Sequence, residues 1–184
     1  MEGNRAVGVR MADGREFRAP RVISDAGVVN TYMHLLPQEQ VQRHGLLDTL
    51  EQVDSSVAHL CLYLGFKKTD AELGLTRPNL WMYPGYDHDA QHAAYMQNSD
   101  APFPVVYASF PSAKDPAWAE RNPGRSTIDL ITLAPYEWFS AWHGARWKHR
   151  GDDYEALKAR FTERLLEVLY TRLPQLRGQV DFHE

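Results

Sequence analysis

The densest group of side chains that could bind a metal lies in residues 87–92. Asp87, His88, Asp89 and His92 fall in this stretch, and the two histidines would share one face of a helix at a spacing of four. The glutamate of the HExxH pattern is absent, and no distant third ligand is indicated. Aspartates also cap the exposed N–H groups at a helix start. We therefore predict a capped helix with solvated histidines, and no metal.

Three other chemistries lack their motifs. A dinucleotide site needs glycines between a strand and a helix so that the backbone can approach a pyrophosphate, and the sequence has no GxGxxG. The nearest phosphate-loop match, residues 3–8, is followed by Val9 and Arg10 where lysine and serine or threonine are required. GxSxG is also absent, and the single cysteine, Cys61, lies in an apolar run that predicts a buried, unreactive thiol. We therefore assign no catalytic residue.

Aromatic residues are dense between residues 81 and 147, and walls of such residues hold large apolar ligands. They are Trp81, Tyr83, Tyr86, Tyr95, Phe103, Tyr107, Phe110, Trp118, Tyr136, Trp138, Phe139, Trp142 and Trp147. Each one taken alone is better explained by core or surface packing. As a set they favour a hydrophobic ligand or a buried interface.

The stretch FPSAKDP, residues 110–116, closes a predicted strand and places one lysine at the end of this aromatic wall. A turn built from serine and Asp-Pro explains the pattern structurally. The functional alternative is that the lysine supplies a polar handle for a ligand. Our candidate substrate-binding residues are Tyr83, Phe110, Lys114, Trp118 and Trp138.

The composition of the chain indicates one ordinary globular domain of 184 residues, with 43% hydrophobic and 24% charged residues. The 20 basic and 24 acidic residues are spread along the chain, so we expect no nucleic-acid partner. Residues 1–20 are too polar for a signal peptide, and no window approaches the roughly 18 apolar residues of a membrane span. We expect a cytoplasmic protein that is at most peripheral to a membrane.

An Asp13-Gly14 turn between alternating apolar residues predicts a β-hairpin over residues 6–19. Pro20 ends the ladder, and residues 21–24 predict a short apolar strand. These two elements come before the main body of the chain.

Residues 28–53 are good helix formers, but Pro37 and Gly45 interrupt them, so we predict two or three short helices. Residues 57–66 then form a run that is apolar on both faces, which predicts a central strand.

Turns and one short helix, beginning near Asp87 or Asp89, separate the remaining predicted strands. These strands are residues 80–83, 105–110 and 127–133. An amphipathic helix follows over residues 152–173, and residues 179–184 begin another strand. This order predicts an α+β fold, in which an antiparallel or mixed sheet is backed by helices and preceded by a hairpin.

Several stretches of the chain resemble FAD-dependent oxidoreductases of the phytoene desaturase and retinol saturase (all-trans-retinol 13,14-reductase-like) family. They are GVRMADG (8–14), VISDAG (22–27), FPSAKDPAW (110–118), YEWF (136–139) with Trp142, and RGDDY (150–154) followed by Leu157 and Lys158. The resemblance covers nearly the whole chain. FPSAKDPAW and YEWF are more similar to the retinol saturase branch than to the desaturases.

This resemblance implies that residues 1–27 belong to the edge of an FAD-binding domain and residues 28–184 to a substrate-binding domain that is truncated at its C-terminal end. In the family, the FAD pyrophosphate loop lies far upstream of the hairpin, and a second flavin-contacting segment lies just past the last residue of this chain. We therefore expect FAD in the full-length parent and none on this segment alone, which would be inactive by itself. A second functional alternative for Lys114, besides a polar handle for a ligand, is that it approaches a flavin.

The resemblance also implies that the parent saturates, desaturates or isomerises carbon-carbon bonds of a polyene isoprenoid, a carotenoid or a retinoid. The expected partners are the remaining FAD-binding part of the parent chain, the apolar polyene, a peripheral membrane contact and a second copy paired through exposed strand edges. Two alternatives remain open from the residues: a free-standing module that binds a hydrophobic ligand, and a protein-interaction domain.

Overall fold

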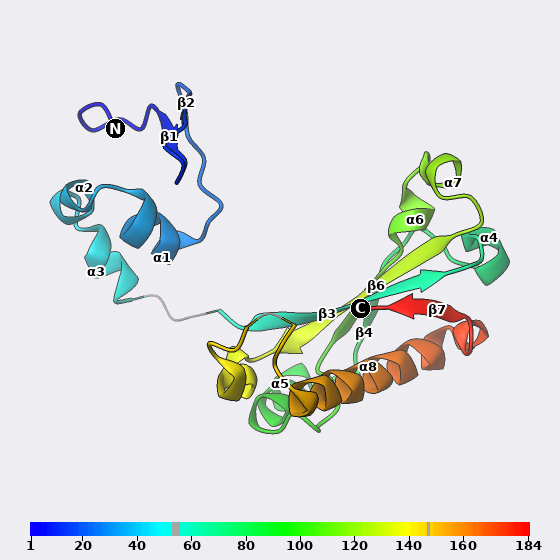
Figure 1. Cartoon of the computed structure of the whole chain (residues 1–184). Helices are drawn as coiled ribbons and strands as arrows, with labels where there is room; N and C mark the ends of the chain where they lie inside the picture. The colour runs from blue at the N-terminus through cyan, green and yellow to red at the C-terminus, as the bar shows by residue number, and fades with distance from the viewer. Residues whose placement is uncertain (53–55, 147) are drawn as a thin grey trace. The chain divides into compact units, whose positions relative to one another are not determined.

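The computed structural model describes residues 1–52, 56–146 and 148–184, which form two compact units, Met1–Ser56 and Val57–Glu184 (Figure 1). Two predicted positions, Val53 at the end of the helical region and Trp147 of the aromatic set, lie outside the described residues. Each unit is described by itself.

The first unit begins with the predicted hairpin, in which β1 (Gly8–Arg10) pairs antiparallel with β2 (Glu16–Arg18). The strand predicted for residues 21–24 is wrong, because these residues form no strand and Ile23 is 94% exposed. A short apolar run becomes a strand only when a neighbouring strand supplies hydrogen bonds, and none of the described strands pairs with this run.

Short helices complete the first unit, as predicted. They are α1 (Val28–Asn30), η1 (Thr31–Leu35), α2 (Gln38–Arg43) and α3 (Leu46–Leu50). Pro37 lies at the start of α2, where its missing N–H costs no helical hydrogen bond. Gly45 precedes α3 with a φ of 61°, a left-handed conformation that favours glycine.

The second unit is built on a five-stranded sheet with the order β4-β5-β6-β3-β7, in which every neighbouring pair is antiparallel. The strands are β3 (Ala58–Phe66), β4 (Leu80–Met82), β5 (Val106–Ser109), β6 (Ser126–Ala134) and β7 (Val180–His183). The predicted strands and the antiparallel α+β fold are therefore confirmed. The longest ladder joins β3 to β6, from Ala58 opposite Ala134 to Phe66 opposite Ser126.

Helices α5 and α8 lie on one side of this sheet, as Figure 1 shows. The helical segments of the second unit are α4 (Asp70–Leu73), α5 (His88–Gln97), α6 (Pro111–Lys114), α7 (Trp118–Arg121), η2 (Tyr136–Trp142), α8 (Asp152–Arg172) and η3 (Pro174–Leu176). The Asp87 carboxylate accepts a hydrogen bond of 3.0 Å from the Ala90 N–H, which confirms the predicted cap of α5.

The core lies between the sheet and α8, because side chains alternate between the two faces of each strand. Leu62 and Leu64 of β3 are buried there with Phe161, Leu165 and other apolar side chains of α8. The opposite face of β3 is open, so the prediction of a buried Cys61 is wrong and its thiol is exposed. The helices cover only one face of the sheet, although the strand is apolar on both.

Tyr95 of α5 is fully buried, and its hydroxyl donates a hydrogen bond of 2.9 Å to the Leu133 carbonyl. Burial raises the pKa of Tyr95 from its usual value near 10 to about 12. The unfolded chain loses this proton near pH 10, whereas the folded chain keeps it until about pH 12. The free energy of unfolding is therefore expected to fall as the pH rises from 10 to 12.

Urea unfolding at several values between pH 8 and 12 measures this fall. Tyr95→Phe should show a smaller fall, because phenylalanine does not titrate. Tyr86→Phe is the matched control, because it removes the hydroxyl of a fully exposed tyrosine. Its free energy of unfolding should fall with pH by as much as that of the unaltered chain. Equal falls in the two variants would contradict the assignment to Tyr95.

Candidate functional site

The open face of the sheet carries a straight row of side chains across four neighbouring strands. Trp81 of β4 lies opposite Tyr107 of β5, Tyr107 opposite Ile131 of β6, and Ile131 opposite Cys61 of β3. The Trp81 and Tyr107 rings are 4.7 Å apart between centroids. Trp81 is 61% exposed and Cys61 is also exposed, so the row meets solvent. We call these four residues the aromatic row.

A more polar row runs next to the aromatic row on the same face, where Ser109 lies opposite Asp129 and Asp129 opposite Tyr63. Burial raises the pKa of the Asp129 carboxyl, and the nearby charge of Lys114 partly opposes this effect. The pKa of Tyr63 is also raised, in the first place by the charge of Cys61. The open face therefore carries the mainly apolar aromatic row and, next to it, a row that contains the ionisable side chains of Asp129 and Tyr63.

Lys114 is held at the β5 end of this polar row. Its ammonium group donates hydrogen bonds to the Asn79 side-chain oxygen and, over 2.9 Å, to the Ser109 hydroxyl. The segment that was predicted as a turn is the short helix α6, which ends at Lys114. This arrangement fixes one positive charge beside the open face.

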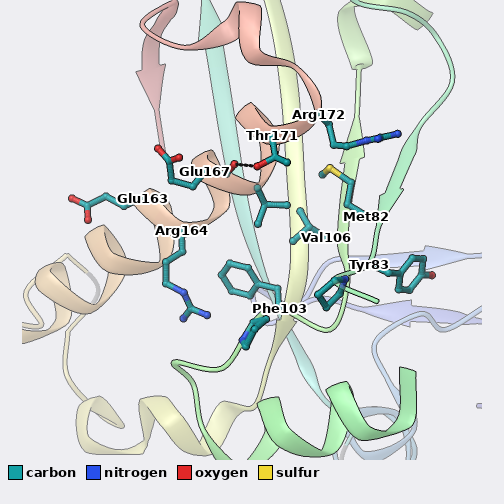
Figure 2. Close-up of a pocket in the computed structure, with 12 residues that line it drawn as sticks. Met82, Tyr83, Phe103, Val106, Glu163, Arg164, Glu167, Thr171 and Arg172 are labelled. Atoms are coloured by element: carbon teal, nitrogen blue, oxygen red, sulfur yellow. Dashed lines mark hydrogen bonds between the residues drawn. The ribbon is translucent and has the colours of Figure 1, made fainter. Parts of the chain in front are cut away.

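A concave region lies on the other side of the sheet, between α8 and strands β4 and β5. Figure 2 shows this groove, which has a volume of about 570 Å³. It is lined by apolar residues that include Met82, Phe103, Val106 and Val168, and by polar side chains of α8. We call it the helix-side groove.

The other candidate residues lie at separate places. Tyr83 lines the helix-side groove, and Phe110 is buried in the core. Trp118 lines a hollow of about 420 Å³ beside α6 and α7, and its indole N–H donates 2.8 Å to the Arg125 carbonyl. Trp138 is half-buried and stacks on Phe161 at a centroid distance of 6.2 Å. The five candidates, Lys114 included, therefore do not line a single cavity.

None of the four residues of the aromatic row is among the candidate substrate-binding residues that the sequence suggests. Trp81 and Tyr107 belonged to the aromatic set but were not chosen, and Ile131 and Cys61 were interpreted as strand interior. The signal was present in β3, which is apolar on both faces although helices cover only one. Without the register of the strands, no pattern shows which of these side chains are neighbours.

Metal binding finds no support in the residues that the structure describes, since no three histidine, cysteine or acidic side chains among them are grouped to hold an ion. His88 instead stacks on Tyr83, with ring centroids 4.5 Å apart and planes 5° from parallel.

In the same described residues, no helix is long and apolar enough to cross a bilayer.

The starts of the two longest described helices also do not fit the pyrophosphate of FAD. Such a group binds at a helix start through free backbone N–H groups. The two longest helices begin with acid: the Asp87 carboxylate already caps α5, and the first turn of α8 contains Asp152, Asp153 and Glu155. These carboxylates would repel a pyrophosphate. Neither helix start is therefore suited to hold the cofactor.

Comparison with known proteins relates the chain to enzymes named for polyenes. No family model matches the chain. It is 34% identical over 188 residues to the all-trans-retinol 13,14-reductase of Danio rerio, covering 98% of this chain and 31% of the relative. The corresponding protein of Rattus norvegicus is 36% identical over 184 residues, covering 96% of the chain and 30% of the relative.

A more distant relative is the chloroplastic prolycopene isomerase of Arabidopsis thaliana, which is 28% identical over 189 residues, covering 100% of this chain and 28% of the relative. The chain thus spans only about 30% of the length of the curated relatives that it matches. By sequence, the chain is therefore similar over nearly its whole length to part of the all-trans-retinol 13,14-reductases, with prolycopene isomerase and phytoene desaturase as more distant relatives.

Proposed function

We propose that the parent protein is an FAD-dependent oxidoreductase acting on carbon-carbon bonds of a polyene isoprenoid, a retinoid or a carotenoid. This chain would supply one wall of the substrate site. The names of its relatives, which refer to retinol, prolycopene and phytoene, support the substrate class. The observation that carries the proposal is the aromatic row of Trp81, Tyr107, Ile131 and Cys61, in which Trp81 and Cys61 are exposed and the two central residues are half-buried.

The shape and polarity of that row suit a polyene. Neighbouring strands are about 4.7–4.9 Å apart, so side chains on four strands extend over about 14 Å. A conjugated isoprenoid chain is long, flat and without hydrogen-bonding groups, so it gains most from an extended apolar surface. Each 100 Å² of apolar surface that the ligand removes from water contributes about 2.5 kcal/mol. Lys114, at the end of the neighbouring polar row, remains in the proposed site.

The cofactor would be held by other parts of the parent chain. The acidic helix starts of the described residues support this division, because they do not fit a pyrophosphate. The hairpin supports it too: Val9 and Phe17 are about half exposed, as expected if a further domain covers them. We propose that residues 1–27 belong with that FAD-binding domain and residues 28–184 with the substrate-binding domain.

Two measurements on this chain test the proposal. Retinol should quench its tryptophan fluorescence in a saturable way, and Trp81→Phe should lose most of the quenching while its affinity stays within about threefold, because the aromatic contact is kept. After incubation with FAD and gel filtration, the protein peak should carry no flavin absorbance, whereas a longer chain that includes the pyrophosphate loop should be yellow. If the chain binds no retinoid or carotenoid, it does not form a wall of the substrate site. If the 184-residue chain keeps flavin absorbance after gel filtration, the proposal that other parts of the parent chain hold FAD is refuted.

A further inference from the structure

The helix-side groove is separate from the proposed polyene wall, because it lies on the other face of the sheet. Met82 and Val106 are directly opposite one another on β4 and β5 and line the groove. Their chain neighbours Trp81 and Tyr107 point to the open face, since successive side chains of a strand alternate. A ligand in the groove would therefore not touch the aromatic row.

The floor of the groove is apolar. Met82, Val106, Phe103 and Val168 line it, and its volume of about 570 Å³ lies within the range of small-molecule sites. Methionine and valine side chains present flexible aliphatic surface, which suits an alkyl chain. The floor alone, however, does not distinguish a neutral ligand from a charged one.

The charges of α8 around the groove do make that distinction. The Glu167 carboxylate is neutralised by Arg177, which donates two hydrogen bonds of 2.7 and 2.8 Å to it. The Arg164 guanidinium is occupied by the carbonyls of Ser99 and Ala101 and lies 4.4 Å from the centre of the Phe103 ring. Neither the Glu167 carboxylate nor the Arg164 guanidinium is therefore free to bind the head group of a ligand.

Arg172 is the cation of the groove that is free to bind a head group, because it has no ion pair or side-chain hydrogen bond among the described residues. Figure 2 shows Arg172 on the Met82 side of the groove, with its guanidinium extending outward past Met82. The carboxylates of Glu163 and Glu167 lie on the opposite side and point away from Met82 and Val106. One end of the apolar floor therefore has an available guanidinium, which prefers a planar oxyanion.

We infer that the helix-side groove binds a single-chain amphiphile with an anionic head group, such as a fatty acid. The alkyl chain lies over Met82, Val106 and Val168, and the head group pairs with Arg172. A cationic head would be repelled by Arg172, and an alcohol would leave its guanidinium without a charged partner. Binding of this amphiphile does not depend on the proposed polyene chemistry.

Isothermal titration of the chain with decanoate, decyl phosphate and decanol, below their aggregation concentrations, tests the inference. At least one anionic ligand should bind roughly tenfold more tightly than decanol, as expected for one charge-assisted hydrogen-bonded pair. If both anions bind, the tighter one identifies the head group. Arg172→Gln should reduce this advantage to within about twofold, with decanol binding unchanged, and Glu163→Gln is the matched control with no loss.

A second variant tests the location. Val168→Trp fills the groove and should abolish binding of all three ligands, and circular dichroism checks that the variant folds. If the variant does not fold, the location is tested on the unaltered chain instead. There, the NMR signal of the Met82 methyl group must shift when the anion is added. Ile131→Asp on the open face should leave anion binding unchanged, so that this inference and the proposed function can fail separately. Equal affinity for decanoate, decyl phosphate and decanol, or an unaffected Arg172→Gln, would overturn the inference.

Discussion

Replacing Phe161 by alanine is expected to lower the free energy of unfolding of the second unit by about 3–5 kcal/mol. Phe161 is 1% exposed and lies on the face of α8 that packs against the sheet. Its ring is 6.2 Å from that of Trp138 and 6.3 Å from that of Phe103. The substitution removes these contacts and leaves a cavity that rigid strands cannot fill by relaxing.

Urea unfolding followed by far-ultraviolet circular dichroism measures this loss. Because small domains are stable by only about 5–15 kcal/mol, this loss is expected to remove a large share of the stability of the unit. Phe182→Ala is the matched control: Phe182 is 58% exposed on the edge strand β7, and its loss should cost less than about 1 kcal/mol. Similar losses in the two variants would show that α8 does not pack on the sheet through Phe161.

Replacing Ile131 by aspartate is expected to weaken polyene binding at least tenfold, if the aromatic row is the substrate wall. Ile131 lies at the centre of the row, between Tyr107 and Cys61. A carboxylate there would lose its water beneath an apolar ligand, and no described cation lies in the row to compensate it. Asp129 on the same strand and face would add repulsion.

Tryptophan quenching by retinol measures the affinity of this variant. Ile131→Leu keeps the apolar volume and should bind within about threefold of the unaltered chain. Gln97→Asp adds the same charge at an exposed position at the end of α5 and should have no effect. Undiminished binding by Ile131→Asp, with the sheet intact by circular dichroism, would exclude the open face as the polyene wall.

The elements that were predicted correctly depend on interactions between residues close in sequence. The Asp13-Gly14 turn predicts the hairpin, Pro37 and Gly45 divide the short helices, and Asp87 caps α5. In each case the deciding interaction is made by a turn, a break or a cap within a few residues. Such interactions can be predicted from a sequence because their geometry does not depend on the rest of the molecule.

The predictions that failed depend on what lies beside a segment. Residues 21–24 have the composition of a strand, but no described strand pairs with them. Cys61 lies in an apolar run, but the helices cover the opposite face of β3 and leave its thiol exposed. Strand formation and burial both require a partner that a local pattern does not identify.

The candidate site shows the same difference between features that depend on local sequence and features that depend on contacts between distant segments. The α+β class, most strand positions and the amphipathic helix α8 follow from patterns in the sequence, which also carries the resemblance to polyene oxidoreductases. The folded arrangement was needed to show that Trp81, Tyr107, Ile131 and Cys61 form one row, and that Met82 and Val106 line a groove on the other face. The reason is that cross-strand neighbours are set by register between segments far apart in sequence, and a shift of one residue exchanges the two faces.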